Sequence, residues 1–387
     1  MKIAILSPAT LHDFQEMIGE ELPEGLIFNS LTPLIQYFIE QKHEVYLVTL
    51  DKNIKKSKVV KGKNITIFIG KYRKTAKVRA ADNFAYEVYQ MTQFLKKNPC
   101  DIYHANWSYE FAKAALNISV KKTLITLHDW APEVYRHLHD YYRKKRLNMN
   151  NSVIEKGEHF STVSPYIEQQ FREQYSDKIM SVIPNCIETV GVYDYGRQLC
   201  KGNSTILCVN NGFTPLKNVE KSILAFQIYC KKNKDAYLYL YGLGFEPDGA
   251  CKEWVKKNNI DDEKIIYCGK VSHNEIVRRM SEADVLLHAS KEESFGLVLA
   301  EAMMVGTPVI GGDKSGAVPW VLNYGSAGIL VDIDSEKEIA NALEYLLGDD
   351  EIWKMYSRSG YEYANSKFEI EAIGKKYLEE YYHIVGE

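Results

Sequence analysis

The stretch KEESFGLVLAEAMMVGTPVIGG, residues 291–312, predicts a charged loop, an apolar helix and a buried strand in direct succession. The helix begins near Gly296 and runs through LVLAEAMM; Gly306 then follows as a C-terminal cap, and Pro308 prevents the helix from continuing. The run DVLLHAS, residues 284–290, leads into this stretch and is largely apolar, as strands buried on both faces of a parallel sheet are. This order of strand, loop, helix and strand indicates an α/β fold.

The same alternation extends through the rest of the chain in two blocks. In the first block, helical patterns such as LTPLIQYFIEQ (31–41) and FAYEVYQMTQFLKK (84–97) separate short apolar runs. We expect strands in this block at 2–8, 43–50, 64–70, 101–106, 123–128, 159–164 and 179–185. In the second block we expect them at 204–210, 236–242, 264–269, 284–290, 307–312 and 328–332. Each block therefore predicts βαβ units and a doubly wound parallel sheet.

The length of the chain favours two domains over one. A chain of 387 residues is too long for a single ordinary core. The polar segment CIETVGVYDYGRQLCKGN, 186–203, has neither helical nor strand periodicity, and we interpret 188–203 as a linker. It separates an N-terminal domain, 1–187, from a C-terminal domain, 204–365. Two such domains in tandem predict a ligand-binding cleft between them, because open α/β sheets bind ligands at the carboxyl ends of their strands.

Charge, cysteine content and hydropathy limit the class of protein. The formal net charge of −3 provides no field that would attract nucleic acid, so we expect no nucleic-acid partner. Seven cysteines without a CxxC pair suit free thiols in a reducing cytoplasm better than disulfides or a zinc site. No apolar run reaches the ~20 residues that a membrane span requires, and the N-terminal run is too short for a signal peptide. We therefore expect a soluble, cytoplasmic protein.

Two acids flank the start of the helix in 291–312: Glu293 precedes it, and Glu301 lies inside it. No side chain at 295–298 can satisfy the first N–H groups of the helix, so these amides and the helix dipole form an anion site suited to phosphate. Glu301 would accept hydrogen bonds from sugar hydroxyls on one side of the anion, and Glu293 would face the other side. This arrangement suits a nucleotide sugar. The alternative is chance, because acids are common at helix starts for reasons of the dipole alone.

The same stretch closely resembles the E-x7-E region of retaining glycosyltransferases of the GT-B fold, in the family called GT4 (glycosyl transferases group 1). The acids, the FG dipeptide, the EAM and the GTPVI all fall in register. Four other segments resemble the family in the same order along the chain: QKHEVYLVT (41–49), TLITLHD (123–129), VIPNCIE (182–188) and GFTPLKN (212–218). The resemblance implies two Rossmann-like domains that face each other across a cleft. It also implies that the C-terminal helix, 366–387, packs back on the N-terminal domain.

The resemblance further implies a retaining, metal-independent hexosyltransferase-type enzyme of class EC 2.4, without a cofactor. Its donor would be a nucleotide-diphosphate sugar, with UDP-sugars favoured and GDP-sugars next. Its acceptor would be a sugar, glycolipid or glycan, in the assembly of surface polysaccharide, glycolipid or glycoconjugate. Location in the cytoplasm, with peripheral contact at the inner face of the membrane as a variant, would fit such a role.

The family's site residues carry over by motif. Three residues have catalytic roles: Glu293 would contact the transferred sugar, Lys217 would neutralise the departing diphosphate, and His128 would face the sugar. Glu301 would hold the ribose, backbone amides would hold the diphosphate, and the base would lie near the turn at 269–271. The implied donor-binding residues are Glu301, Ser294, Phe295, Gly296, Leu297, Gly212 and Val271.

The chain departs from the family at two places. Gly212 stands where an arginine is usual, which leaves Lys217 as the evident cation there, unless Lys270 or Lys314 supplies charge. The loop before the first long helix, FNSLTP, replaces paired glycines, and Asn29 and Ser30 are the candidate donors in their place. The first departure keeps an alternative open: a catalytically weak or silent relative that binds nucleotide sugar or partners with an active transferase. A nucleotide-sugar epimerase is a lesser alternative, since such enzymes generally lack the E-x7-E pattern.

Other patterns have ordinary interpretations beside the functional ones. His128 could be a structural strand-end histidine, and Lys217 a surface lysine. The GLG at 242–244 is more simply a turn than part of a dinucleotide site, and the DID at 332–334 more simply loop acids than a metal site. The basic, aromatic segment RHLHDYYRKKR, 136–146, is interpreted as a solvated helix face, with contact to lipid phosphate as the alternative.

Overall fold

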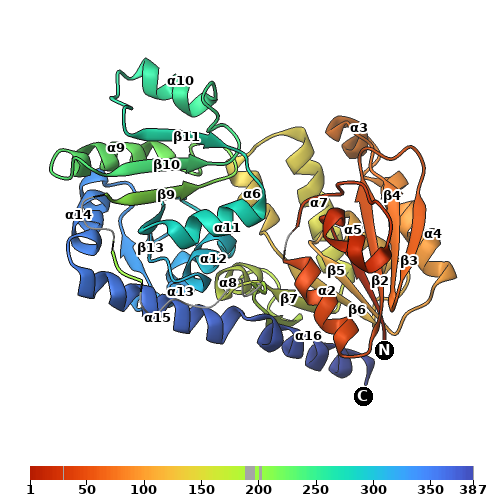
Figure 1. The fold of residues 1–387 in the computed structure, drawn as a ribbon. Helices are drawn as coiled ribbons and strands as arrows, with labels where there is room; N and C mark the ends of the chain where they lie inside the picture. Colours follow the sequence, from red (N-terminus) through yellow and green to blue (C-terminus); the bar gives the residue numbers. More distant parts are fainter. Residues whose placement is uncertain (29, 188–196, 200–202, 387) are drawn as a thin grey trace. The chain divides into compact units, whose positions relative to one another are not determined.

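The computed structural model describes residues 1–28, 30–187, 197–199 and 203–386 (Figure 1). The chain divides into two compact units. Unit 1 consists of Met1–Glu188 and Ile370–Glu387, and unit 2 consists of Thr189–Glu369. Most of the interpreted linker, 188–203, lies outside the described residues.

Unit 1 is built on an eight-stranded sheet of order β3-β4-β2-β1-β5-β6-β7-β8. All pairs are parallel except β3 with β4. Each of the seven predicted strands is present, but β3 was not predicted. The strands are β1 (Lys2–Leu6), β2 (Glu44–Asp51), β3 (Lys58–Gly62), β4 (Ile65–Lys71), β5 (Ile102–Asn106), β6 (Thr123–Leu127), β7 (His159–Thr162) and β8 (Ile179–Val182).

Helices cover the sheet of unit 1, and apolar clusters fill the space between them. They are α1 (Gln15–Ile18), α2 (Leu31–Glu40), α3 (Ala76–Ala81), α4 (Ala85–Lys97), α5 (Glu110–Leu116), α6 (Ala131–His137), α7 (Tyr141–Lys156), α8 (Pro165–Arg172) and α16 (Ile370–Val385), with a 3₁₀ turn at Leu11–Phe14. The C-terminal helix α16 packs on α2, β5 and β6. Its Tyr381 hydroxyl lies 2.6 Å from Nδ1 of the buried His104, which fixes the helix to the centre of the sheet.

Unit 2 contains a six-stranded sheet of order β11-β10-β9-β12-β13-β14, and all its pairs are parallel. The six predicted strands are all present: β9 (Thr205–Val209), β10 (Tyr237–Tyr241), β11 (Ile265–Gly269), β12 (Val285–His288), β13 (Val309–Gly312) and β14 (Ile329–Val331). The helices are α9 (Val219–Cys230), α10 (Ala250–Lys257), α11 (His273–Glu282), α12 (Leu297–Met304), α13 (Val318–Val321), α14 (Glu336–Leu347) and α15 (Asp350–Phe368), with a 3₁₀ turn at Asn323–Gly325.

The strand order of unit 2 fixes where a ligand can bind. From β9 the chain proceeds outward through β10 to β11, and then returns to place β12 on the other side of β9. The two adjacent strands β9 and β12 therefore mark the point at which the winding reverses. In doubly wound sheets the loops that follow two such strands diverge, and the crevice between them is the usual ligand site. In this unit those loops are 210–218 and 289–296.

Candidate functional site

Lys217 and Glu293 meet at this reversal point of unit 2. Lys217 comes from the loop after β9 and Glu293 from the loop after β12, and Nζ of the lysine lies 2.5 Å from Oε1 of the glutamate. The two loops are also joined through their backbones, because Lys291 N donates to Leu216 O at 2.8 Å. Residues separated by 76 positions in the sequence thus form one charged pair at the carboxyl edge of the sheet.

A third residue, His288, completes this group and was not predicted. It is the last residue of β12, is 2% exposed, and places Nε2 at 3.0 Å from the same Oε1 of Glu293. Burial alone would raise the pKa of Glu293, but the charge of Lys217 and the hydrogen bond from His288 outweigh it and lower that pKa. Glu293 is therefore an anion at neutral pH. The histidine in DVLLHAS is the signal that could have identified this contact.

The start of helix α12 has the geometry that the sequence predicts. Its N-cap is Gly296, at φ 89°, and no side chain caps it. A side chain at this position would be strained, because a Cβ would lie 2.4 Å from Cδ1 of Leu299. Among the described residues, no backbone carbonyl accepts from the amides of Gly296, Leu297 or Val298. These N–H groups and the helix dipole can therefore bind an anion.

The residues around this helix start are held in place by packing. Phe295 is buried, with its ring centroid 5.2 Å from that of Phe368 and 6.2 Å from that of Trp320. Ala317 N donates to the carbonyl oxygen of Glu293 at 2.8 Å, which fixes the backbone of the loop. Ser294 and Leu297 are half-buried. The backbone amides thus belong to a fixed loop, as an anion site requires.

Glu301 lies in the second turn of α12 and contacts a histidine from the preceding helix, α11. Nε2 of His273, the first residue of α11, lies 2.8 Å from Oε1 of Glu301. The glutamate side chain is 14% exposed and that of the histidine 35%. Sequence reasoning missed His273. Its place two residues after the predicted base-binding turn at 269–271 was the available signal.

The remaining predicted donor-site residues occupy loops of unit 2. Gly212 has φ 115°, and a Cβ there would meet only Cγ2 of Thr214, at 3.6 Å. An arginine at this position would fit the space but would strain the backbone. Lys270 is exposed, and Val271 is half-buried in the loop after β11. Lys314 is 85% exposed, and its Nζ lies 3.8 Å from Asp313.

In unit 1, His128 follows β6, is hydrogen-bonded to Asn106, and lies against two aromatic rings. Its Nε2 lies 2.7 Å from Oδ1 of Asn106, and its ring centroid is 4.3 Å from that of Trp107 and 5.1 Å from that of Phe28. Burial, reinforced by the neighbouring His104, lowers the pKa of His128 to about 3. His128 is therefore neutral at pH 7.

A small cavity of unit 1 adjoins His128. Asn106 is 3% exposed and its Nδ2 has no partner among the described residues. Ser30 directs its backbone carbonyl toward Sγ of Cys186 at 3.0 Å, whereas Asn29 lies outside the described residues. The cavity is lined by Phe28, Ser30, Leu31, Leu34, Asn106, His128, Pro184, Asn185, Cys186 and Tyr377. Cys186, which stands where the family usually has glycine, is thus part of its wall.

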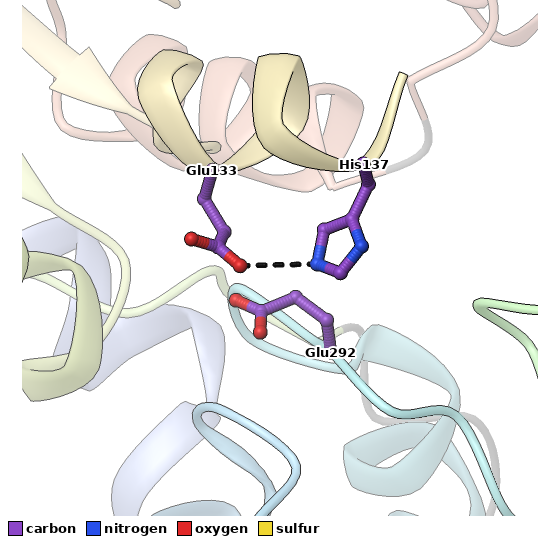
Figure 2. A group of neighbouring side chains, drawn as sticks. All are labelled: Glu133, His137 and Glu292. Carbon is purple, nitrogen blue, oxygen red and sulfur yellow. Dashed lines mark hydrogen bonds and ion pairs between the residues drawn. The ribbon is translucent and has the colours of Figure 1, made fainter. Parts of the chain in front are cut away.

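The segment 136–146 is exposed over most of its length, as interpreted, but it does not form one helix face. Helix α6 ends at His137, and α7 begins at Tyr141 after the N-cap Asp140. Arg146 points inward: its guanidinium carbon lies 3.5 Å from the ring centroid of Tyr109, and its Nη1 lies 3.3 Å from Glu110. Figure 2 shows the end of α6, where Nε2 of His137 lies 3.0 Å from Oε1 of Glu133.

Two other patterns have the ordinary structures that were favoured. The GLG at 242–244 forms a turn after β10, with both glycines at positive φ. In the DID at 332–334, Asp332 Oδ1 accepts from the Asp334 amide at 2.9 Å, and Asp334 pairs with Lys291 at 3.1 Å. These acids therefore belong to a loop after β14. No helix among the described residues is long and apolar enough to cross a membrane.

Solved structures show the same architecture over nearly the whole chain. Sucrose-phosphate synthase from Thermosynechococcus elongatus superposes with a TM-score of 0.78 at 18% identity, over 100% of this chain and 99% of that one. A trehalose-6-phosphate structure from E. coli, bound with UDP-2-fluoro glucose, gives 0.71 at 12% identity, over 98% and 99%. Anabaena HepE in complex with UDP and glucose gives 0.65 at 16%, over 98% and 98%. These likenesses confirm the predicted fold class, the two α/β domains of GT-B structures.

Family models and curated relatives then identify the family. The model Glycosyltransferase Family 4 matches residues 29–190, and Glycosyl transferases group 1 matches 197–363. The chain belongs to the GT4-type glycosyltransferase family.

Among its relatives, N-acetyl-alpha-D-glucosaminyl L-malate synthase of Bacillus anthracis is 28% identical over 50% of this chain and 48% of that protein. D-inositol 3-phosphate glycosyltransferase of Corynebacterium glutamicum (strain R) is 39% identical over 23% and 21%. The matches thus span about half the length of these relatives or less.

Proposed function

We propose that this protein transfers a sugar from a nucleotide-diphosphate sugar to an acceptor hydroxyl, with retention of the anomeric configuration. One observation carries the proposal: the Lys217–Glu293 pair stands beside the open N-terminus of α12, at the reversal point of the unit 2 sheet. A cation and free helix amides suit the diphosphate, while a fixed carboxylate suits sugar hydroxyls. Family membership supports this assignment of roles.

The chemistry would rest on stabilisation of the leaving group. As the glycosidic bond of the donor breaks, negative charge grows on the departing diphosphate and positive charge on the sugar ring. Lys217 has three N–H donors, so it can hold a phosphate oxygen while it remains paired with Glu293. Together with the amides of α12 it would stabilise the growing negative charge by electrostatic preorganisation. In this scheme neither a metal nor a cofactor is required.

Glu293 would position the transferred sugar rather than attack it. Lys217 and His288 both contact Oε1 of Glu293, and the Glu293 side chain is 16% exposed. Oε2, which has no partner among the described residues, is then the oxygen that receives sugar hydroxyls. The acceptor would attack from the same face as the leaving group, so the α configuration of the donor would persist in the product. An inverted anomer in the NMR spectrum of the product would contradict this mechanism.

The nucleotide would bind unit 2, and the acceptor would bind unit 1. Glu301 would accept hydrogen bonds from ribose hydroxyls, and the base would lie against the loop that contains Val271. We favour UDP-sugars, then GDP-sugars, and structural neighbours solved with UDP or a UDP-sugar support this order. The acceptor, a sugar, glycolipid or glycan, would bind unit 1 near His128. A role in surface polysaccharide or glycolipid assembly in the cytoplasm is consistent with a relative named as a lipopolysaccharide core biosynthesis glycosyltransferase.

Calorimetry with UDP, GDP and ADP tests the assignment. One nucleotide should bind the wild type with micromolar affinity, and Glu301→Ala should weaken it by more than about tenfold, or ~1.4 kcal/mol. Glu263→Ala, which removes an exposed acid from the same unit, is the matched control and should bind as the wild type does. If no nucleotide binds the wild type, the transferase assignment fails.

The alternative function is a weak or silent relative that binds nucleotide sugar or partners with an active transferase. Gly212, which stands where the family usually has an arginine, favours it because a second cation is missing there. Turnover with a bound nucleotide sugar separates the two. Nucleotide binding without transfer, or slow turnover unchanged by Glu293→Ala, would support the weak or silent relative.

A further inference from the structure

One segment of unit 1 carries a large excess of positive charge. Residues 52–79 contain nine lysines and two arginines, and no aspartate or glutamate. The whole chain has a net charge of −3, so the other residues together carry −14, since −3 less 11 is −14. A block of like charge this dense is a candidate for contact with an anionic partner.

The fold gathers most of these lysines at one end of the sheet, where the parallel strands β2 and β4 finish. Strands β2 and β4 are parallel and end side by side at Asp51 and Lys71. Strand β3 runs the other way and begins at Lys58, opposite Ile69 near the end of β4. The loop before β3 and the segment that leads into α3 therefore leave the sheet at the same end, with α3 beyond the end of β4 (Figure 1). We name as the lysine surface the residues Lys52, Lys55, Lys56, Lys58, Lys71, Lys74 and Lys77.

The charges of this surface are not used inside the protein. Both arginines of the segment are engaged within the protein, because Arg73 pairs with Asp82 and Glu87, and Arg79 is 5% exposed. By contrast, none of the seven lysines forms an ion pair with any described residue. Five are exposed, and Lys58 and Lys71 are half-buried. Asp51, which precedes Lys52 in the sequence, is fully buried and accepts hydrogen bonds from three backbone amides.

Exposed apolar and aromatic side chains lie beside these lysines. Gln90 of α4 exchanges hydrogen bonds with the backbone of Lys71 at 3.1 and 3.0 Å, which holds α4 against the end of β4. Tyr86 and Tyr89 on this helix are 41% and 62% exposed, and Val78 of α3 is 49% exposed. Lysines mixed with tyrosine and aliphatic side chains are typical of surfaces that rest at the interface of a bilayer.

The geometry points to a lipid bilayer with anionic headgroups as the partner of the lysine surface. We prefer it to a single phosphorylated ligand, because recognition of one phosphate favours fixed arginine forks, whereas exposed lysines act as mobile, hydrated point charges. Basic clusters gain affinity for anionic lipid with each added lysine, and the exposed tyrosines and valine would enter the headgroup layer. This inference goes beyond the proposed transfer reaction, and it places the membrane contact on a different segment from the alternative considered for 136–146.

The test is sedimentation of the full chain with phosphatidylcholine vesicles, prepared with and without an equal part of phosphatidylglycerol. The wild type should bind the anionic vesicles, release them as salt is raised, and ignore pure phosphatidylcholine. The test variant carries glutamine in place of Lys52, Lys55, Lys56, Lys74 and Lys77. Its partition coefficient onto the anionic vesicles should be lower by about tenfold or more. The matched control replaces five exposed lysines at the other end of the same sheet, where the parallel strands begin. These are Lys63, Lys96, Lys97, Lys121 and Lys122. This control variant should bind as the wild type does.

Three results would overturn the inference. The first is a wild type that fails to sediment with anionic vesicles. The second is an equal loss of binding in the two variants, which would mean that net charge and not this surface is responsible. The third is binding to heparin or single-stranded DNA but not to vesicles, which would assign the surface to another polyanion. Circular dichroism of both variants checks that each is folded, and nucleotide binding by calorimetry tests the proposed function separately.

Discussion

Nε2 of His288 lies 3.0 Å from Oε1 of Glu293, and this contact joins the buried end of β12 to the charged loop that follows it. Nδ1 of the same imidazole is buried and has no partner among the described residues. A buried polar atom without a partner costs stability, and the contact that the ring does make is with Glu293. We infer that His288 orients Glu293, so that the other carboxylate oxygen faces the transferred sugar.

Substitution of His288 should affect the sugar and not the nucleotide. Because Glu293 would contact only the sugar, His288→Leu should reduce the affinity for UDP-glucose, or the UDP-sugar that binds best, by about tenfold. The affinity for UDP should stay within about twofold. His288→Gln, which retains an N–H donor, should recover part of the loss. Calorimetry with both ligands measures the difference, and an equal loss for UDP and the UDP-sugar would show that His288 only supports the fold.

The contact between His273 and Glu301 leads to a second prediction. His273→Ala should weaken UDP binding by roughly threefold to tenfold, because Glu301 loses the N–H donor that orients it. The double variant with Glu301→Ala should bind no more weakly than Glu301→Ala alone, since the histidine acts through the carboxylate. A double-mutant cycle by calorimetry gives the coupling. Additive losses would mean that His273 contacts the nucleotide by itself.

The sequence predicted the sheets well because their strands are buried on both faces. Apolar runs such as KIAIL and TILCV alternate with helical patterns along the chain, and in that setting they are most simply interpreted as buried strands. Strand β3 was missed for the converse reason. It is an edge strand in which only Val60 is fully buried, and lysines surround it, so its sequence resembles a loop.

The site was predicted in part. The open helix start at Gly296 follows from local sequence, because the absence of a capping side chain can be read directly. The partners of the two acids could not be read in this way. His273 reaches Glu301 across 28 residues, and Lys217 reaches Glu293 across 76, so these contacts depend on strand order. Arg146 was misinterpreted because its basic neighbours suggest solvent, whereas Tyr109 and Glu110 hold it inside.

Acid should destabilise unit 1 through His128. In the folded protein the pKa of His128 is lowered to about 3 by burial and by His104, whereas an unfolded histidine titrates near pH 6.5. Between these values the unfolded chain binds more protons, so the free energy of unfolding falls as pH falls below about 6.5. The loss is at most about 1.4 kcal/mol per pH unit for this group.

Urea unfolding followed by tryptophan fluorescence at several pH values measures this slope. His128→Gln removes the titrating group but keeps an amide near Asn106, and should show a shallower slope between about pH 4 and 6. His12→Gln replaces an exposed histidine of the same unit and should retain the slope of the wild type. Equal slopes for wild type and His128→Gln would contradict the prediction.

Lys217 allows the proposed mechanism to be tested at the leaving group. If its ammonium stabilises the departing diphosphate, Lys217→Met should lower kcat by on the order of 10²-fold or more with a smaller change in KM, as expected for an interaction that strengthens in the transition state. Lys217→Arg should retain part of the activity. Lys291→Met is the control, because this nearby lysine pairs instead with the exposed Asp334.

The decisive comparison uses a second donor, a glycosyl fluoride of the same sugar, whose leaving group is fluoride, so no negative charge grows on a diphosphate beside Lys217. Lys217→Met should then be impaired far less with the fluoride, without added nucleotide, than with the nucleotide sugar. The same loss with both donors would mean that Lys217 acts only through its pair with Glu293, since the glutamate would contact the sugar of either donor. Initial rates with the two donors, measured for wild type and Lys217→Met, therefore separate stabilisation of the leaving group from positioning of the sugar.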